Sequence, residues 1–121
     1  MSTELVIELP KFDTGLYEGC EFIISGGDAK LTLFFSELPP FAINFSRVRW
    51  HQFTALPNCN VEMIRSAYFQ LVAVRHSNSL RVFVEADRAP RKAYKELHHY
   101  RIFLDETGCH ELFAESAHRM P

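Results

Sequence analysis

Apolar and polar residues alternate over short stretches of this chain, which is the pattern of β-strands with one buried face. The first stretch covers residues 5–9 and stops at Pro10. Two more cover residues 20–24 and 31–35, and the sequence Ser25-Gly26-Gly27-Asp28 lies between them. Glycine tolerates positive φ, so this sequence predicts a tight turn that joins the two stretches as a hairpin.

The next apolar stretch changes phase along its length. Pro39-Pro40 excludes a central strand at that point, because proline cannot donate to a sheet ladder. Phe41, Ile43 and Phe45 then share one face, but Val48 and Trp50 continue that face with an offset of one residue. A phase slip within an extended run is typical of a β-bulge. We therefore expect residues 41–53 to form one long, bent strand with a bulge near Arg47.

A strand followed by a helix is predicted in the middle of the chain. Residues 61–65 fit either a helical turn or the lead-in to a strand, while residues 68–74 are almost wholly apolar and predict a strand near the centre of a sheet. Residues 76–79 offer several N-caps, and Leu80, Phe83 and Val84 have the spacing of a short helix that packs on the sheet. Pro90 should end or kink this helix, and residues 91–96 form a polar connection in which helix could resume.

The C-terminal residues predict a β-hairpin. Residues 98–104 and 109–115 read as its strands, and residues 105–108 as a turn that ends on Gly108. The prediction for the whole chain is an α+β fold: a predominantly antiparallel, twisted β-sheet of about seven strands with one helix packed on one face. At 121 residues, the chain fits a single domain spanning residues 1–121.

Composition indicates a globular protein of the cytoplasm. The hydrophobic fraction of 47% can fill a core, and the charged fraction of 23% argues against disorder. No apolar run approaches the ~18 residues that span a bilayer, so we expect no membrane association. The three cysteines, an odd number without CxxC spacing, favour reduced thiols in the cytoplasm.

Charge is unevenly distributed along the chain. Residues 1–45 hold seven acids and two bases, residues 46–101 ten bases and four acids, and the last twenty residues four acids and one base. The basic middle could meet an acidic partner or a phosphate backbone, or it could be neutralised by acids within the fold. A pI of about 6.3 disfavours nucleic acid as the partner.

No group of residues has the spacing of an active site or a metal site. His99 and His110 fall on adjacent strands with Cys109 nearby, but HxH, HExxH and CxxC spacings are absent, and neighbouring His98 and His99 must point to opposite faces. Cys109, His99 and Asp105 could be drawn as a nucleophile with its base, yet Cys109 lies beside acids that do not lower the pKa of a thiol. We expect no catalytic residues, no metal and no cofactor.

Two acids of the last strand, Glu111 and Glu115, are expected to face solvent on the same side of that strand. They would lie some 13 Å apart along it, too far for a catalytic carboxylate pair. Trp50 continues the apolar face of its own strand and should belong to the core.

The acids themselves are the preferred site. The first strands and the last hairpin concentrate exposed carboxylates, which would form a negative face able to plug the basic groove of a partner such as a nuclease. Ordinary solubility charge is the alternative. The residues predicted to contact a partner are Glu21, Glu37, Asp105, Glu106, Glu111 and Glu115.

Two stretches carry a resemblance to a known group of proteins. The strand-to-helix passage of residues 68–80 and the terminal hairpin of residues 98–115 resemble small bacterial immunity proteins of polymorphic and contact-dependent toxin systems. The resemblance implies a twisted antiparallel sheet with a helix and a protein-binding, non-catalytic role, with a cognate toxin as partner. It transfers no individual binding residue to this sequence.

Two other functions stay open. One is a small ligand-binding domain or enzyme with a pocket in the curved sheet, lined by Phe, Tyr and Trp50, for which convergent polar groups would be the sign. The other is a homodimer in which an edge strand pairs with its copy.

Overall fold

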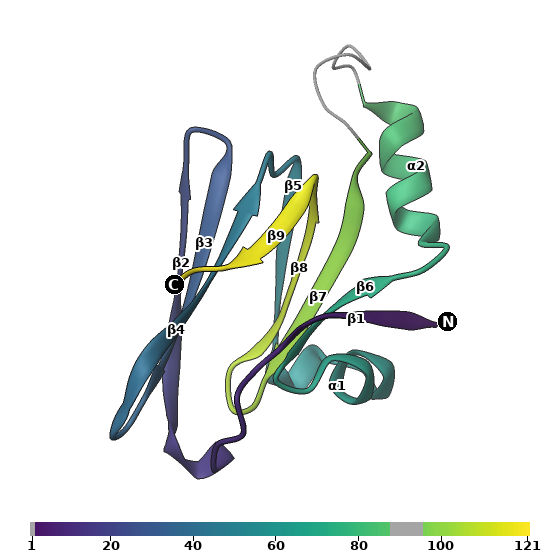
Figure 1. The fold of residues 1–121 in the computed structure, drawn as a ribbon. Coiled ribbons are helices and arrows are strands. Elements are labelled where there is room, and N and C mark those ends of the chain that lie inside the picture. Colours follow the sequence, from purple (N-terminus) through teal and green to yellow (C-terminus); the bar gives the residue numbers. More distant parts are fainter. Residues whose placement is uncertain (1, 88–95) are drawn as a thin grey trace.

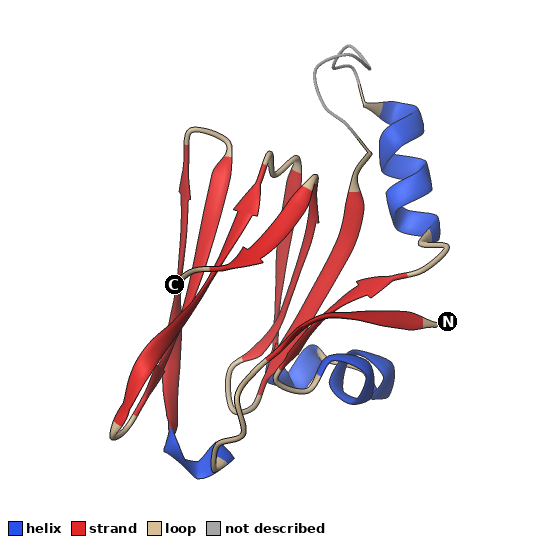
Figure 2. Ribbon diagram, in the orientation of Figure 1, coloured by secondary structure: helices blue, strands red, loops and turns tan. Residues whose placement is uncertain are grey.

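Nine strands and two α-helices make up residues 2–87 and 96–121, the part of the chain that the computed structural model describes. The strands form two antiparallel sheets that face each other, and both α-helices lie on the outer side of the larger sheet (Figures 1 and 2). The predicted α+β class, dominated by antiparallel sheet with a helix packed on one face, is confirmed. The prediction of about seven strands and one helix was too low.

The larger sheet, here called sheet A, has five strands in the order β1-β6-β7-β8-β5. These strands are β1 (Thr3–Glu8), β5 (Trp50–Ala55), β6 (Gln70–Val74), β7 (His98–Leu104) and β8 (Gly108–Ala114). The two α-helices flank β6 in the sequence: α1 (Val61–Ala67) precedes it, and α2 (Asn78–Ala86) follows it.

The smaller sheet, here called sheet B, has four strands in the order β2-β3-β4-β9. They are β2 (Tyr17–Ser25), β3 (Asp28–Phe35), β4 (Leu38–Ser46) and β9 (Ser116–Arg119). Two short 3₁₀ helices complete the connections, η1 (Thr14–Leu16) between the sheets and η2 (Leu56–Asn58) before α1.

Alternating side chains of the two sheets form one core between them. Leu31 and Leu33 of β3 and Ile43 of β4 are fully buried against Ile102 of β7 and Leu112 of β8. Because side chains of a strand alternate between its faces, the residues between these point outward. On sheet A this leaves a second, outer face that the helices cover.

The outer face of sheet A carries a smaller core under α1. Met63 and Ala67 of α1 are buried against Val72, Phe103 and Cys109. By contrast, α2 has no buried residue, and it touches the sheet through Phe83, whose ring lies 5.2 Å from that of Phe113. The predicted amphipathic helix after His76 is present, with Ser77 as its N-cap.

Residues 41–53 do not form one bent strand. They are split between β4 in sheet B and β5 in sheet A, and Arg47 at the crossing has a φ of 54°. The phase slip in the sequence therefore marks the point where the chain changes sheets. The bulge predicted near Arg47 is wrong, because a change of sheet shifts the buried face in the same way.

Pro39 and Pro40 lie within β4, in spite of the predicted break. Strand β9 pairs only with residues 43–46 of β4, so the segment that holds the prolines has an open edge on that side. Proline is tolerated there because no neighbouring strand needs its missing N–H. Strand β9 itself is short and was not predicted.

The C-terminal hairpin is confirmed as β7 and β8, and the strand at residues 68–74 as β6. The ambiguous segment at residues 61–65 is helical, in α1. Helix α2 ends at Ala86; the predicted effect of Pro90 and the connection beyond it lie outside the described residues, apart from Glu96.

Gly108 opens β8 in a conformation that only glycine fits. Its φ is +145°, and a Cβ atom at this position would overlap with the backbone carbonyl oxygen of Thr54 on β5. Gly26, in the β2–β3 turn, also has positive φ, of +61°, but has no atom within 4 Å of a Cβ placed there. A substitution at Gly108 would therefore cause both backbone strain and steric overlap, whereas one at Gly26 would cause backbone strain alone.

We predict that Gly108→Ala lowers the free energy of unfolding by about 3 kcal/mol or more, because strain and overlap with a paired strand add. Gly26→Ala, with strain alone, should cost about 1 kcal/mol. Urea denaturation of both variants measures the difference. Equal losses would show that the close approach of β5 to Gly108 is not what the position requires.

Candidate functional site

Arginines of the basic middle segment pair with acids inside the fold. Arg101 binds Glu111, with Nε 2.7 Å from Oε1, and Arg49 binds Asp87 at 2.8 Å. Three further pairs are more exposed: Arg47 with Glu115, Arg75 with Glu4, and Arg81 with Glu85. Of the two alternatives for the basic middle, neutralisation by acids within the fold therefore applies to these five arginines.

Unpaired acids gather at one end of the molecule. There η1, the β3–β4 turn and the β7–β8 turn come together, at the lower end of Figure 1. The Ser36 backbone N–H donates to the Leu16 carbonyl over 2.8 Å, and the hydroxyls of Tyr17 and Thr107 lie 2.9 Å apart. We call this region the acidic end; its carboxylates are those of Asp13, Glu18, Glu37, Asp105 and Glu106.

None of the five carboxylates of the acidic end makes a salt bridge with the residues that the structure describes. A small pocket of about 120 Å³ lies among them, lined by Thr14, Gly15, Tyr17, Asp105 and Glu106. The hydroxyl of Tyr68, a side chain 41% exposed, donates to Asp105 Oδ2 over 3.3 Å beside it. The end thus combines uncompensated negative charge, a pocket and an exposed aromatic ring.

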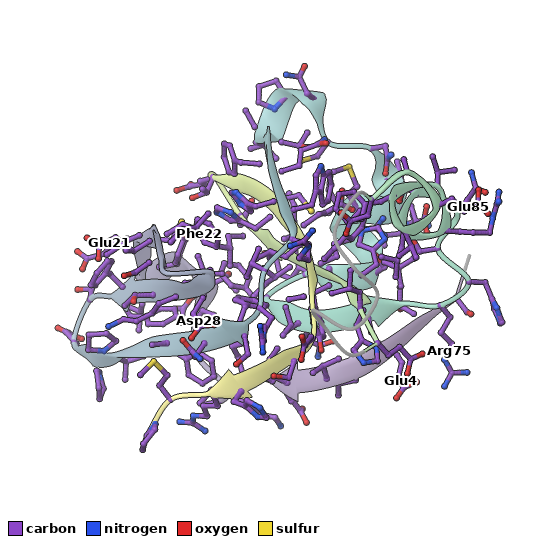
Figure 3. All side chains as sticks on the ribbon, turned by 90° about the horizontal axis from the view of Figure 1, so that it is seen from above. Glu4, Glu21, Phe22, Asp28, Arg75 and Glu85 are labelled. Atoms are coloured by element: carbon purple, nitrogen blue, oxygen red, sulfur yellow. The ribbon has the colours of Figure 1, made fainter. Side chains whose placement is uncertain are left out.

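The six predicted contact residues are divided by the fold. Glu37, Asp105 and Glu106 meet at the acidic end, and Glu21 is exposed in the middle of β2. Figure 3 shows Glu21 on the side of the molecule away from the Glu4–Arg75 pair.

The other two acids, Glu111 and Glu115, interact within the fold. Glu115 pairs with Arg47 at 3.5 Å, and its side chain is only 14% exposed. The prediction that Glu111 faces solvent is wrong, because it lies on the outer face of β8 beneath the helices and is 8% exposed. Neither carboxylate is therefore available to a partner as an unpaired surface charge.

Glu111 belongs to a buried polar network on the outer face of sheet A. Arg101, opposite it on β7, also approaches Glu62 Oε1 at 3.7 Å and Ser66 Oγ at 3.3 Å, both on α1. Burial raises the pKa of Glu111, but the contacts from His99 and the charged Arg101 outweigh it and leave this pKa below its usual value. The carboxylate is therefore ionised at neutral pH.

The same network reaches α2 through a Ser–His–Glu series. Ser77 Oγ lies 2.6 Å from His99 Nδ1, and His99 Nε2 lies 3.4 Å from Glu111 Oε1 without forming a well-aligned hydrogen bond. The sequence indicated Ser77 as one of several N-caps, and it raised His99 as a metal ligand and as the base beside Cys109, without connecting these two residues. A hydroxyl, an imidazole and a carboxylate in series are the parts of a nucleophilic site.

Two observations argue for a structural role of this series instead. Ser77 Oγ already accepts the Leu80 backbone N–H, as the cap of α2, over 3.1 Å. Glu111 Oε1 lies closer to Arg101, at 2.7 Å, than to His99, so the guanidinium compensates the charge that would have to polarise the imidazole. The series anchors the start of α2 to β7.

A cavity of about 340 Å³ lies beside the start of α2, between β6 and β7. Its lining includes Arg75 and Arg81, but Arg75 pairs with Glu4 and Arg81 with Glu85. The charges of these two arginines are therefore already compensated, and they give the cavity no preference for an anionic ligand.

The histidine and cysteine groupings considered from the sequence are not brought together. His99 pairs with Phe113, and His110 pairs with Ile102, three residues further along β7. Because side chains alternate between the faces of a strand, His99 points to the outer face of sheet A and His110 to the inner face. Cys109 is buried under α1, and burial raises its pKa to about 12. Among residues 2–87 and 96–121, no group of three or more His, Cys, Asp and Glu could hold a metal ion.

A different set of these residues meets at the edge where β2 and β5 close the two sheets. His51 Nε2 lies 3.0 Å from His110 Nδ1, and Cys20 Sγ lies 3.7 Å from His110 Nε2. The ring of Phe22 stacks on His51 with centroids 3.9 Å apart. Burial, with a smaller contribution from repulsion by His51, lowers the pKa of His110 to about 4, so this edge is held together by neutral rings.

Comparisons with known proteins give no assignment: no protein family, no curated protein and no solved structure matches this chain. Neither described helix is long and apolar enough to cross a membrane. Function must therefore be inferred from the chain's own residues.

The buried histidines predict that stability depends on pH. The folded state holds the pKa of His110 near 4, below the ordinary value of 6.5, so the unfolded state binds the extra proton between these values. We expect the free energy of unfolding to fall by up to about 3 kcal/mol as pH drops from 6.5 toward 4. Urea denaturation at several pH values above 4.5 avoids the range in which Glu111 also titrates.

His110→Gln should flatten this dependence, while His118→Gln, an exposed histidine of β9, should leave it as in the wild type. A wild-type slope that persists in His110→Gln would contradict the assignment to this ring.

Proposed function

We propose that this chain is a non-catalytic protein-binding domain that recognises a basic protein through its acidic end. The observation that carries the proposal is the contrast between acids. Glu4, Glu85, Asp87, Glu111 and Glu115 are matched by arginines, whereas the carboxylates of the acidic end have no cation beside them in the described part of the chain. Leaving like charges together costs stability, so their location calls for a role outside the fold.

The features around these carboxylates suit a protein partner. The pocket lined by Asp105 and Glu106 can take the ammonium or guanidinium of a basic side chain, with the Thr14 and Tyr17 side chains beside it. Tyr68 supplies an exposed aromatic ring, of the type enriched at the centres of protein interfaces. Long-range attraction between opposite charges would also speed association.

The kind of partner follows from the same chemistry. A protein with a basic groove, such as a toxin that cleaves nucleic acid, would be blocked by an acidic end seated in that groove. The resemblance of residues 68–80 and 98–115 to bacterial immunity proteins points to the same role. We therefore propose a cognate bacterial toxin as the partner, with this domain as its immunity protein.

The test is binding to, and neutralisation of, each toxin-like protein encoded beside this chain's gene. We expect one of them to form a complex whose affinity falls steeply between low and physiological salt, because exposed charges are screened. Glu106→Lys should weaken that complex tenfold or more. Glu21→Lys, the same change on the middle of β2, should alter it less than twofold.

Two results would overturn the proposal. One is that no neighbouring gene product binds even at low salt or loses its toxicity. The other is that Glu106→Lys and Glu21→Lys weaken the complex equally, which would indicate an effect of net charge alone. Both variants should keep the wild-type unfolding midpoint, since each replaced side chain makes no ion pair in the described structure.

A further inference from the structure

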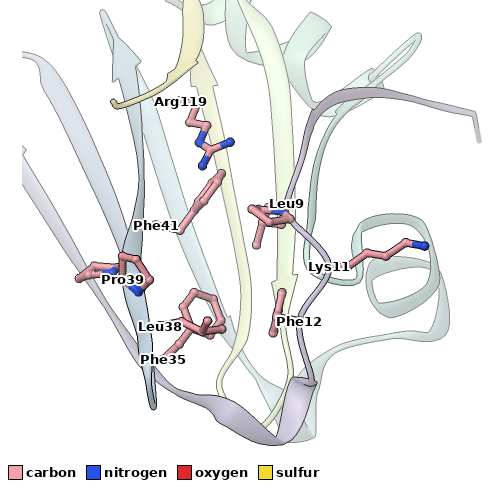
Figure 4. Close-up of a pocket in the computed structure, with 10 residues that line it drawn as sticks. Leu9, Lys11, Phe12, Phe35, Leu38, Pro39, Phe41 and Arg119 are labelled. Carbon is pink, nitrogen blue, oxygen red and sulfur yellow. The ribbon is translucent and has the colours of Figure 1, made fainter.

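A cleft of about 170 Å³ opens between the two sheets on the side opposite the β2–β5 edge. One wall is the segment that follows β1, with Leu9 and Phe12, and the other is formed by Phe35, Phe41 and the prolines of β4 (Figure 4). Leu9 and Phe41 are buried, at 7% and 6% exposure. The sequence raised a pocket lined by Phe, Tyr and Trp50, but the walls of this cleft come together only when the sheets pack, and they hold phenylalanines without Tyr or Trp50.

The floor of the cleft is aromatic and fixed in place. The Phe12 ring contacts that of Phe35 with centroids 4.6 Å apart and that of Phe69 at 5.2 Å. Edge-to-face contacts of this kind hold aromatic rings in defined orientations. The cleft is therefore a preformed apolar site.

One uncompensated cation lies over this apolar floor. The guanidinium carbon of Arg119 lies 4.6 Å from the centroid of Phe41, and Figure 4 shows its side chain directed over the cleft. Lys11 lines the cleft as well, with its ammonium directed away. No acid lines the cleft, and Arg119 makes no salt bridge with the described residues, in contrast to the five paired arginines.

From this combination we propose that the cleft binds a small organic acid, with its apolar body on the phenylalanine floor and its carboxylate on Arg119. A guanidinium binds carboxylates through two parallel hydrogen bonds, and a ring beneath it keeps it in position. The volume is below the 300 Å³ or so of sites for drug-sized molecules, which limits the ligand to about the size of an arylalkanoic acid.

A small acid is favoured over the C-terminus of a peptide. An extended peptide bound at a sheet edge depends on backbone hydrogen bonds with that edge. Pro39 and Pro40, in the wall of the cleft, have no N–H to donate. The site thus offers side-chain recognition of a carboxylate and little pairing for a backbone.

The probe is 3-phenylpropionate, compared with its neutral amide, by NMR titration of the intact chain. We expect saturable shifts at Phe12 and Phe41 and at least a tenfold preference for the acid over the amide. Arg119→Gln should abolish that preference while leaving binding of the amide unchanged. Arg65→Gln, an arginine of α1 that also makes no described salt bridge, is the matched control and should keep the preference.

Three results would overturn the proposal. The first is the lack of a saturable shift at these rings up to about 10 mM, tenfold above the 1 mM that corresponds to about −4 kcal/mol. The second is a preference for the acid that survives in Arg119→Gln, and the third is tighter binding of the tripeptide Gly-Gly-Phe than of the acid. The last would assign the cleft to a peptide C-terminus. None of them bears on the acidic end, which shares no residue with the cleft.

Discussion

Arg101 and Glu111 lie opposite each other on β7 and β8, where helices exclude most water from both side chains. A buried charge without a partner destabilises the fold, so each of these two side chains requires the other as its ion-pair partner. From this pair, contacts extend to Glu62 and Ser66 on α1 and through His99 to Ser77 at the start of α2. The pair therefore links both helices to sheet A, although α2 buries no side chain of its own.

The same division of charge organises the surface. Arg47, Arg49 and Arg75 pair with acids that are distant in sequence. Arg101 pairs with Glu111 across the β7–β8 hairpin, and Arg81 pairs with Glu85 within α2. Among the charges that the fold leaves unpaired, two sets lie at pockets: the carboxylates of the acidic end, gathered by the meeting of η1 with two turns, and Arg119 over an aromatic cleft. Charges that are unpaired within the fold are available to ligands. The acidic end should therefore prefer a cationic partner, and the cleft with Arg119 an anionic ligand.

Local patterns predicted the local elements well. The alternation at residues 31–35, the glycines of the β2–β3 turn and the N-caps at residues 76–79 depend on neighbours in sequence, so these features could be predicted. The path of residues 41–53 was mistaken because a bulge and a change of sheet shift the buried face alike. Among the candidate contact residues, Glu37 and Glu106 are exposed, as expected, whereas Glu111 is buried. Its burial depends on Arg101 and on helices that arrive from other parts of the chain, and no pattern within β8 reveals that cover.

A double-mutant cycle measures whether Arg101 and Glu111 stabilise the outer face of sheet A as a coupled pair. The free energy of unfolding is measured in urea for Arg101→Met, Glu111→Leu and the double variant. We predict that each single change costs about 3 kcal/mol or more, because it strands a buried charge, and that the double variant costs less than the sum by about 2 kcal/mol. Costs that simply add would show that the two side chains stabilise the fold independently, and would contradict the account.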